Sequence, residues 1–258
     1  MRYPEGLFGW IDLMTREPQR AIEFYGGLFG WTHVDLPTPM GPPYTQFSKD
    51  GRLVAGLSPM MPGVPDQIGA FWNSYIIVED VDTTLAKVQA AGGTATMPAM
   101  DVMDQGRLAM CTDPSGAPVG LWQPAAHQGA DLFNAPGSLT WNELQTRDLD
   151  AALQFYEEVF GWEWADGPDS GYKVANLNTK TDEDKSNAGA MAMPEGVPAE
   201  APSYWAVYFA VDDCDTSMAA AEQLGGQVFL PAMQMGPGRF GGLVDPTGGM
   251  FMVGSFGG

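Results

Sequence analysis

The sequence predicts an α+β protein made of two tandem domains, each with two βαβββ units whose curved sheets enclose a cavity. One observation is a repeat. The segment "WIDLMTREPQRAIEFYGGLFGW" at 10–31 returns as "WNELQTRDLDAALQFYEEVFGW" at 141–162, with ten of 22 positions identical. The other is an order of patterns. A strand-like alternation, a helix-like periodicity and three short strands follow one another twice in each copy.

The repeat continues along the chain and defines the domains. Residues 71–93 return at 204–226, and residues 106–116 return at 238–248. We therefore expect one domain at 1–125 and a second at 138–258. The segment 126–137 between them contains Ala, Gly and Pro and is expected to be a linker.

In the first unit, residues 7–14 alternate as a strand does, and Pro18 suits the first turn of a following helix. Three short strands are then expected at 31–36, 44–49 and 52–57. The apolar face of the helix has the spacing i, i+3, i+4, i+7, with Ala21, Phe24, Tyr25 and Leu28.

The second unit repeats this order. A strand at 72–80 precedes a helix at 81–93, which Gly92 ends. The proline-rich segment 58–70, with its counterpart at 193–203, joins the units and is unsuited to a central strand. Three further strands are expected at 94–97, 107–112 and 117–122, with an Asp-Pro-Ser-Gly turn at 113–116.

Composition excludes several kinds of partner. The net charge is −20, from 32 acidic and 12 basic residues, which argues against binding to nucleic acid or to anionic membranes. No apolar run is long enough to span a bilayer, and residues 1–10 lack the apolar stretch of a signal peptide. We expect a cytoplasmic monomer or homodimer whose two cysteines, Cys111 and Cys214, are reduced and structural.

Two motifs give the chain a family resemblance. The helix ends in "FYxxxFGW", and a "DPxG" turn precedes an apolar strand, once in each copy. With the paired βαβββ units, these motifs resemble the vicinal oxygen chelate superfamily, which includes glyoxalase I, bleomycin-resistance proteins and extradiol dioxygenases. The resemblance is greatest to two-domain actinobacterial glyoxalase-like or "hydroxylase" proteins. It implies the fold but no single activity, because the superfamily includes isomerases, lyases, oxygenases, thiol transferases and binding proteins.

The resemblance also implies where a metal would be bound. Metal enzymes of the superfamily use His or Glu side chains on the first and last strands of each unit. Neither histidine of the chain, His33 or His127, is expected near these positions, so we expect no metal and no other cofactor. The corresponding positions are Trp10, Asn73, Gly120 and residues near 55–57 in the first domain, and Trp141, Ala206, Met252 and 188–191 in the second.

Each domain nevertheless offers one carboxylate and one phenol to its cavity, because a side chain two residues from a ligand position shares its face of the strand. These are Asp12 and Tyr75 in the first domain and Glu143 and Tyr208 in the second. We expect each pair to face each other, with the carboxylate as general acid or base. The alternative is that each acid only hydrogen-bonds a buried neighbour.

Other residues are candidates for ligand contacts. Arg107 and Arg239 each stand six residues before an Asp-Pro turn, either as an anion clamp or as surface ion pairs. Sixteen methionines and eight tryptophans indicate an apolar pocket for an uncharged or aromatic molecule. The expected ligand contacts are Trp10, Asn73, Trp141, Trp205, Met252, Arg107 and Arg239.

The function favoured by the sequence is binding and transformation of a small hydrophobic or aromatic metabolite by acid–base chemistry, without a metal. One alternative is a binding protein that sequesters such a compound, as bleomycin-resistance proteins do. The other is a metal-dependent lyase or dioxygenase of the glyoxalase type, which the residues at the ligand positions oppose.

Overall fold

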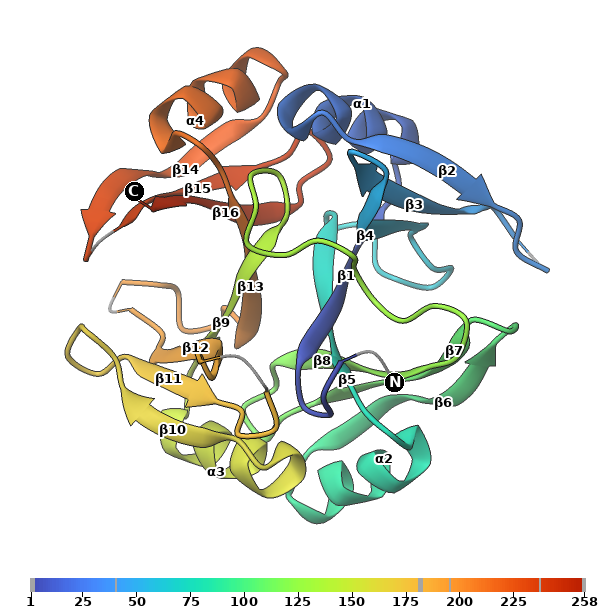
Figure 1. The fold of residues 1–258 in the computed structure, drawn as a ribbon, viewed down its shortest axis with the longest axis vertical. Helices are drawn as coiled ribbons and strands as arrows, with labels where there is room; N and C mark the ends of the chain where they lie inside the picture. Colours follow the sequence, from blue (N-terminus) through green and yellow to red (C-terminus); the bar gives the residue numbers. More distant parts are fainter. Residues whose placement is uncertain (1–2, 40, 181–182, 195, 237, 257–258) are drawn as a thin grey trace. The chain divides into compact units, whose positions relative to one another are not determined.

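A computed structural model describes residues 3–39, 41–180, 183–194, 196–236 and 238–256 (Figure 1). In these ranges the strands form two eight-stranded sheets, ordered β2-β3-β4-β1-β5-β8-β7-β6 and β10-β11-β12-β9-β13-β16-β15-β14. The two sheets have the same order of equivalent strands, which confirms the expected tandem α+β fold.

The bounds of the elements follow the predicted order closely. The first sheet contains β1 (Phe8–Thr15), β2 (Thr32–Leu36), β3 (Tyr44–Lys49), β4 (Arg52–Pro59), β5 (Phe71–Ile77), β6 (Thr94–Val102), β7 (Gly106–Thr112) and β8 (Pro118–Pro124). The second contains β9 (Leu139–Thr146), β10 (Glu163–Asp166), β11 (Lys173–Asn176), β12 (Ser186–Ala192), β13 (Tyr204–Ala210), β14 (Gln227–Met235), β15 (Gly238–Val244) and β16 (Met250–Phe256). The helices are α1 (Pro18–Phe29), α2 (Val81–Ala90), α3 (Leu149–Phe160) and α4 (Cys214–Gln223).

Local chemistry explains where the helices begin and end. Pro18 occupies the first turn of α1, and Gly30 ends that helix with a left-handed backbone, φ 68°. In the second copy, the Asp148 carboxylate accepts a hydrogen bond from the Ala151 amide at the start of α3, and Gly161 ends it, also at φ 68°. The "FGW" motif therefore marks the same helix stop twice.

Two strands differ from prediction. The strand expected at 72–80 ends at Ile77, because Asp80 caps the N-terminus of α2. The strand expected at 94–97 continues to Val102 and includes Pro98. This strand, β6, is last in its sheet's order, and an edge strand accommodates a residue without an amide hydrogen.

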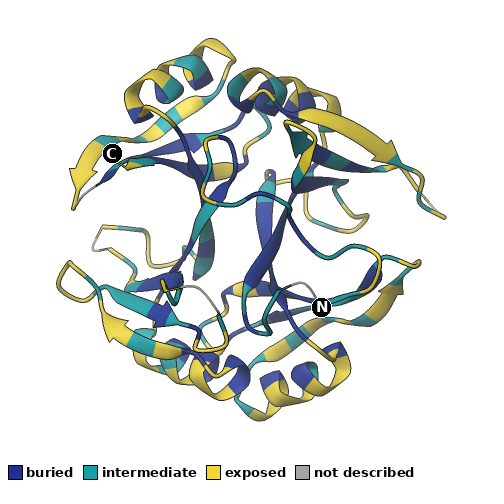
Figure 2. Cartoon of the chain, viewed as in Figure 1, coloured by how far each residue is buried: buried dark blue, intermediate teal, exposed yellow. Residues whose placement is uncertain are grey.

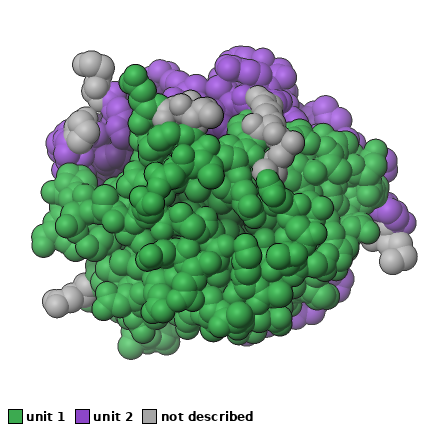
Figure 3. Space-filling model, turned by 60° about the horizontal axis from the view of Figure 1, so that its bottom comes forward, with its two compact units in different colours: residues 1–10, 74–129, 141–205 green, residues 11–73, 130–140, 206–258 purple. Residues whose placement is uncertain are grey.

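The compact units of the chain do not coincide with its two halves. One unit contains residues 1–10, 74–129 and 141–205, and the other contains residues 11–73, 130–140 and 206–258 (Figure 3). We call them unit 1 and unit 2. Each has its own apolar core, drawn from both halves, and Figure 2 shows the buried strand interiors. The expected domain limits, 1–125 and 138–258, stay a prediction.

The two family motifs meet inside these cores. In unit 2, the Tyr25 hydroxyl of α1 donates to Asp245 Oδ2 of the distant "DPTG" turn at 2.8 Å, and Trp72 Nε1 donates to the Tyr25 oxygen at 3.2 Å. Burial, followed by the Asp245 charge, holds the pKa of Tyr25 well above its ordinary value. The helix tyrosine of one half is therefore tied to the turn aspartate of the other half.

Unit 1 has the equivalent residues, Tyr156 and Asp113. Trp205 Nε1 donates to the Tyr156 hydroxyl at 2.7 Å. Burial and then the nearby Asp113 charge raise the pKa of Tyr156. The cysteines are free and buried, and burial raises the pKa of Cys111 to about 12. No helix in the described ranges is long and apolar enough to cross a membrane.

Candidate functional site

Asp12 lies on the face of β1 that points away from the core. Its neighbours Ile11 and Leu13 are completely buried in the core of unit 2, so alternation turns Asp12 the other way. Its carboxylate accepts hydrogen bonds from Asn73 Nδ2 at 3.0 Å and from the Tyr44 hydroxyl at 3.3 Å. Asn73, an expected ligand contact, is thus a direct neighbour of the expected catalytic acid.

Glu143 holds the equivalent place on β9 in unit 1. The Tyr172 hydroxyl donates to its Oε2 at 3.0 Å, and Gln145 Nε2 donates to its Oε1 at 3.1 Å. Trp141 Nε1 donates to the Tyr172 oxygen at 2.9 Å, and the Tyr204 hydroxyl donates to Gln145 Oε1 at 3.0 Å. These five side chains form a continuous hydrogen-bonded group, which we call the Glu143 cluster.

The phenols of this cluster keep their protons. Burial and then the Glu143 charge raise the pKa of Tyr172, and the same two causes in the same order raise that of Tyr204. Both hydroxyls therefore donate hydrogen bonds at neutral pH, Tyr172 to the Glu143 carboxylate and Tyr204 to the Gln145 amide oxygen.

The phenols expected to face the two acids lie elsewhere in their sheets. Tyr75 packs its ring over Gly120, its register partner on β8. Tyr208 is the register partner of Met252 on β16, and its ring meets Phe240 edge to face at 6.1 Å. Tyr75 and Asp12 belong to different compact units, as do Tyr208 and Glu143, so both expected pairings stay predictions.

Sequence reasoning missed Tyr44 and Tyr172, the phenols that contact the acids. Their signal was available, because each lies at or just before the strand after the hairpin loop, in "PPYTQF" and "SGYKVA". The repeat is interrupted between 32 and 57 by loops of unequal length, which hides the correspondence. Gln145 and Tyr204 have no polar counterpart in the first half, where Met14 and Phe71 stand instead.

Trp205 is part of the core of unit 1 and bonds Tyr156, and its expected ligand contact stays a prediction. His127 requires a correction. His127 was expected away from the ligand positions, but its ring centroid lies 4.4 Å from that of Trp10. The linker returns to the sheet here, because the His127 amide donates to the Gln105 carbonyl and Trp122 Nε1 donates to the His127 carbonyl.

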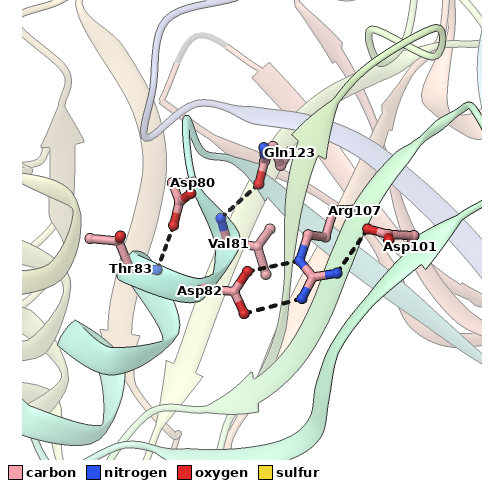
Figure 4. Close-up of polar contacts among 7 residues, drawn as sticks. All are labelled: Asp80, Val81, Asp82, Thr83, Asp101, Arg107 and Gln123. Atoms are coloured by element: carbon pink, nitrogen blue, oxygen red, sulfur yellow. Dashed lines mark hydrogen bonds and ion pairs between the residues drawn. The ribbon is translucent and has the colours of Figure 1, made fainter.

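The two repeated arginines form ion pairs. Arg107 contacts both carboxylate oxygens of Asp82, at 2.8 and 3.1 Å, and Asp101 at 2.8 Å (Figure 4). Arg239 contacts Asp215 in the same way, at 2.5 and 2.8 Å. These contacts agree with the ion-pair interpretation, while the expected ligand contacts of both arginines stay predictions.

Beyond the acids and their partners, the sheet faces that point away from the cores carry apolar side chains in both units. In unit 2 the face includes Tyr208, Phe240 and Met252, with Phe229 packed against Gly242 of the neighbouring strand. Phe229 and Phe256 are 43% and 54% exposed. In unit 1, Met110 pairs with Gly120 and Leu108 pairs with Trp122 on the corresponding face. Exposed apolar surface of this kind is typical of an interaction site.

A hollow of about 340 Å³ lies at another place in unit 2, lined by Thr15, Arg16, residues 59–64 and Asp66. Arg16 donates to the carbonyls of Val64, Pro65 and Ile68 at 2.6 to 3.0 Å. The Arg16 guanidinium holds this loop in place through these bonds. The hollow therefore lacks the carboxylate–phenol pairs found at Asp12 and Glu143.

The residues at the family's metal-binding positions do not fit a divalent metal. They are indole, amide, methyl, thioether and glycine groups, whereas such ions need imidazole and carboxylate donors that converge. Within the described ranges, no group of three or more His, Cys, Asp or Glu side chains could hold a metal ion.

Comparison with known proteins identifies the family. Residues 7–121 and 138–253 match the family model described as the Glyoxalase/Bleomycin resistance protein/Dioxygenase superfamily. The chain belongs to this superfamily. It is 44% identical to a Mycobacterium tuberculosis protein provisionally named glyoxylase CFP32, over 97% of this chain and 95% of that protein. It is 36% identical to the anthracycline biosynthesis protein DnrV of Streptomyces peucetius, over 98% and 94%.

Solved structures of superfamily members have the same fold. The Mn(II)-bound glyoxalase from Novosphingobium aromaticivorans aligns with a TM-score of 0.67 at 15% identity, over 97% of this chain and 82% of that chain. The 2,3-dioxygenase LapB from Pseudomonas sp. KL28 aligns with a TM-score of 0.65 at 16% identity, over 98% and 92%. At these identities the likeness concerns the fold alone.

Proposed function

We propose that this superfamily member binds a small hydrophobic or aromatic metabolite on the sheet faces that point away from the cores. The protein transforms this metabolite by acid–base chemistry that needs no metal. The observation that carries the proposal is the repeated carboxylate–phenol pair, Asp12 with Tyr44 and Glu143 with Tyr172. It occurs once in each half, on the strand face that carries the expected metal-ligand positions Trp10 and Trp141.

The apolar faces support the class of ligand. Aromatic and methionine side chains offer flat, adaptable contact surfaces. The name of DnrV places that relative in anthracycline biosynthesis, and anthracyclines are polycyclic aromatic compounds. With a net charge of −20, the chain also repels anionic ligands at long range.

The proposed chemistry assigns one role to each kind of group. The Asp12 or Glu143 carboxylate accepts a proton from the ligand, and a protonated phenol beside it keeps the carboxylate in place. General acid–base catalysis of this kind contributes about 10²–10⁴-fold to a rate.

The experiment begins with native mass spectrometry of the purified chain, to identify the compound that co-purifies with it. Turnover and binding of that compound are then measured for Asp12→Asn and Glu143→Gln. We expect at least one variant to lose about 10²–10⁴-fold in turnover while its Kd changes less than about threefold. Glu157→Gln, at an exposed position on α3, is the matched control and should behave as the parent does.

Each alternative has its own result. Tight binding without turnover in the parent protein supports a sequestering protein instead. Stoichiometric transition metal, with turnover abolished by a chelator and restored by the metal, supports a metal-dependent lyase or dioxygenase. Full turnover in both carboxylate variants contradicts the acid–base assignment.

A further inference from the structure

Three glycines lie at or within the positions where the resemblance implies acids of a metal site, and a tyrosine lies over each of them. A β-carbon added to Gly56 would come within 1.9 Å of the Tyr44 hydroxyl oxygen, and one added to Gly189 would come within 1.9 Å of the Tyr172 hydroxyl oxygen. A β-carbon on Gly120 would lie 2.2 Å from the Tyr75 ring. A phenol therefore occupies the space that a glutamate side chain would need.

The strand order explains why glycine is required. In the order β3-β4-β1, Gly56 of the middle strand is the register partner of Asp12. Tyr44, from the strand on the other side, reaches across Gly56 to the Asp12 carboxylate. Any side chain at residue 56 would block this path.

Unit 1 has the same geometry from different residues. In the order β11-β12-β9, Gly189 of the middle strand is the register partner of Glu143. Tyr172, which precedes β11, reaches across Gly189 to the Glu143 carboxylate. Two copies with differing loops and differing acids thus preserve one arrangement of tyrosine, glycine and carboxylate.

The Tyr172 hydroxyl is also oriented from two sides. It accepts the indole hydrogen of Trp141 at 2.9 Å and donates to Glu143 at 3.0 Å. Because the one hydrogen of this hydroxyl points to Glu143, the pair offers a ligand acceptor oxygens, which suit the donor of a ligand hydroxyl.

We propose that Tyr172 and Tyr44 hold an oxygen atom of the ligand at the place where the metal ion of related enzymes would hold it, with Glu143 and Asp12 as their partners. The ligand class is a neutral aromatic compound bearing a hydroxyl group. This inference rests on the proposed function for the location of the ligand, but not for its turnover.

The test uses two probes that differ by one oxygen, 2-naphthol and naphthalene. The full-length protein should bind 2-naphthol about tenfold or more tightly than naphthalene, as measured by quenching of tryptophan fluorescence. Tyr172→Phe, Tyr44→Phe or the double variant should reduce this ratio about five- to tenfold, since each removes one hydrogen bond beside a charged group. The indole N–H resonance of Trp141 should shift when 2-naphthol is added.

The matched control is Tyr25→Phe, which removes a phenol of the unit 2 core that donates to Asp245 rather than to Asp12 or Glu143. It should leave the ratio of the two affinities unchanged. The proposal is overturned if the parent protein does not discriminate between the probes, or if the double variant keeps the full ratio. Failure of turnover with intact discrimination would contradict only the proposed function.

A second measurement tests, without a ligand, whether Tyr172 fills the space beside Gly189. Gly189→Glu should lower the Tm by about 5–10 °C, because its side chain overlaps Tyr172. Adding Tyr172→Gly should recover most of that loss by clearing the space. If the double variant were no more stable than Gly189→Glu alone, Tyr172 would not be filling the space that the glutamate side chain needs.

Discussion

At the residue scale, the Asp245 carboxylate of unit 2 is a buried group held by several donors. It is 3% exposed, and it accepts hydrogen bonds from the Tyr25 hydroxyl and from the amides of Thr247 and Gly249. A buried carboxylate is stable only when donors surround it. The "DPxG" aspartate therefore serves both its own turn and the helix of the other half.

We predict that Tyr25→Phe destabilises the protein by about 1.5–3 kcal/mol, since it removes a donor from a buried charge. Urea unfolding measures the loss. Tyr204→Phe is the comparison, because that half-buried hydroxyl donates to a neutral amide and should cost about 0.5–1.5 kcal/mol. Equal losses in the two variants would show that the Tyr25–Asp245 contact has no special weight.

The sequence predicted the strand face of Asp12 and Glu143 but not their phenol partners. That face follows from alternation along one strand, which is a local property that the sequence carries directly. Tyr44 and Tyr172 reach the acids across an intervening strand. Such a contact depends on strand order and on a glycine in between, and no periodicity within one segment reveals either.

At the element scale, α2 begins with a well-formed cap. The Asp80 carboxylate accepts a hydrogen bond from the Thr83 amide at 2.7 Å, and Arg107 bridges Asp82 in the first turn to Asp101 on β6 (Figure 4). Helix α4 repeats this with Asp213, Thr216, Asp215 and Arg239. The bond from Thr83 lowers the pKa of Asp80.

We predict that Asp80→Ala lowers the Tm by about 2–4 °C at neutral pH, while Arg107→Ala changes it little because the ion pair is exposed. Since the folded pKa of Asp80 lies below its ordinary value of 3.8, the cap stabilises above that pH and is lost as pH falls through the lowered pKa. The difference between parent and Asp80→Ala should therefore vanish in acid. Scanning calorimetry from pH 7 to pH 2 measures it.

Ligand binding by the arginine variants tests whether the arginines only form ion pairs. If Arg107→Ala or Arg239→Ala weakened binding of 2-naphthol as much as the tyrosine variants do, the arginine would contact the ligand. Unchanged binding agrees with the ion pairs seen in the structure.

Element positions were more predictable than contacts. Helix and strand patterns are periodic over several residues, and Pro18, Gly30 and the "DPxG" turns mark their limits. The observed strand ends differ from the predicted ones where a neighbouring element sets the end of the strand. β6 extends through Pro98 as an edge strand, and β5 stops early so that Asp80 can cap α2.

At the scale of the whole molecule, each compact unit is completed by both halves of the sequence. Helix α1 packs with α4, and α2 packs with α3. Phe24 and Tyr25 of the first half meet Phe251 of the second, with ring centroids 6.1 and 5.6 Å apart. A sequence repeat predicts two similar halves but does not reveal which βαβββ units of the two halves share a core.

We predict that residues 1–125 and 138–258, expressed separately, do not fold as stable monomers, because each would expose the core surface that the other half covers. Mixing the two fragments should restore native secondary structure and a 1:1 complex. Circular dichroism and size-exclusion chromatography measure both. A cooperatively folded monomer of either fragment would contradict the shared cores.

The crossed pairing of Tyr25 with Asp245 has an evolutionary consequence. After a duplication, one copy is normally free to accumulate substitutions while the other preserves the ancestral role. Here the helix tyrosine inherited by the first copy depends on the turn aspartate inherited by the second. A substitution at either residue is therefore constrained by its contact in the other half, so selection acts on the two halves together.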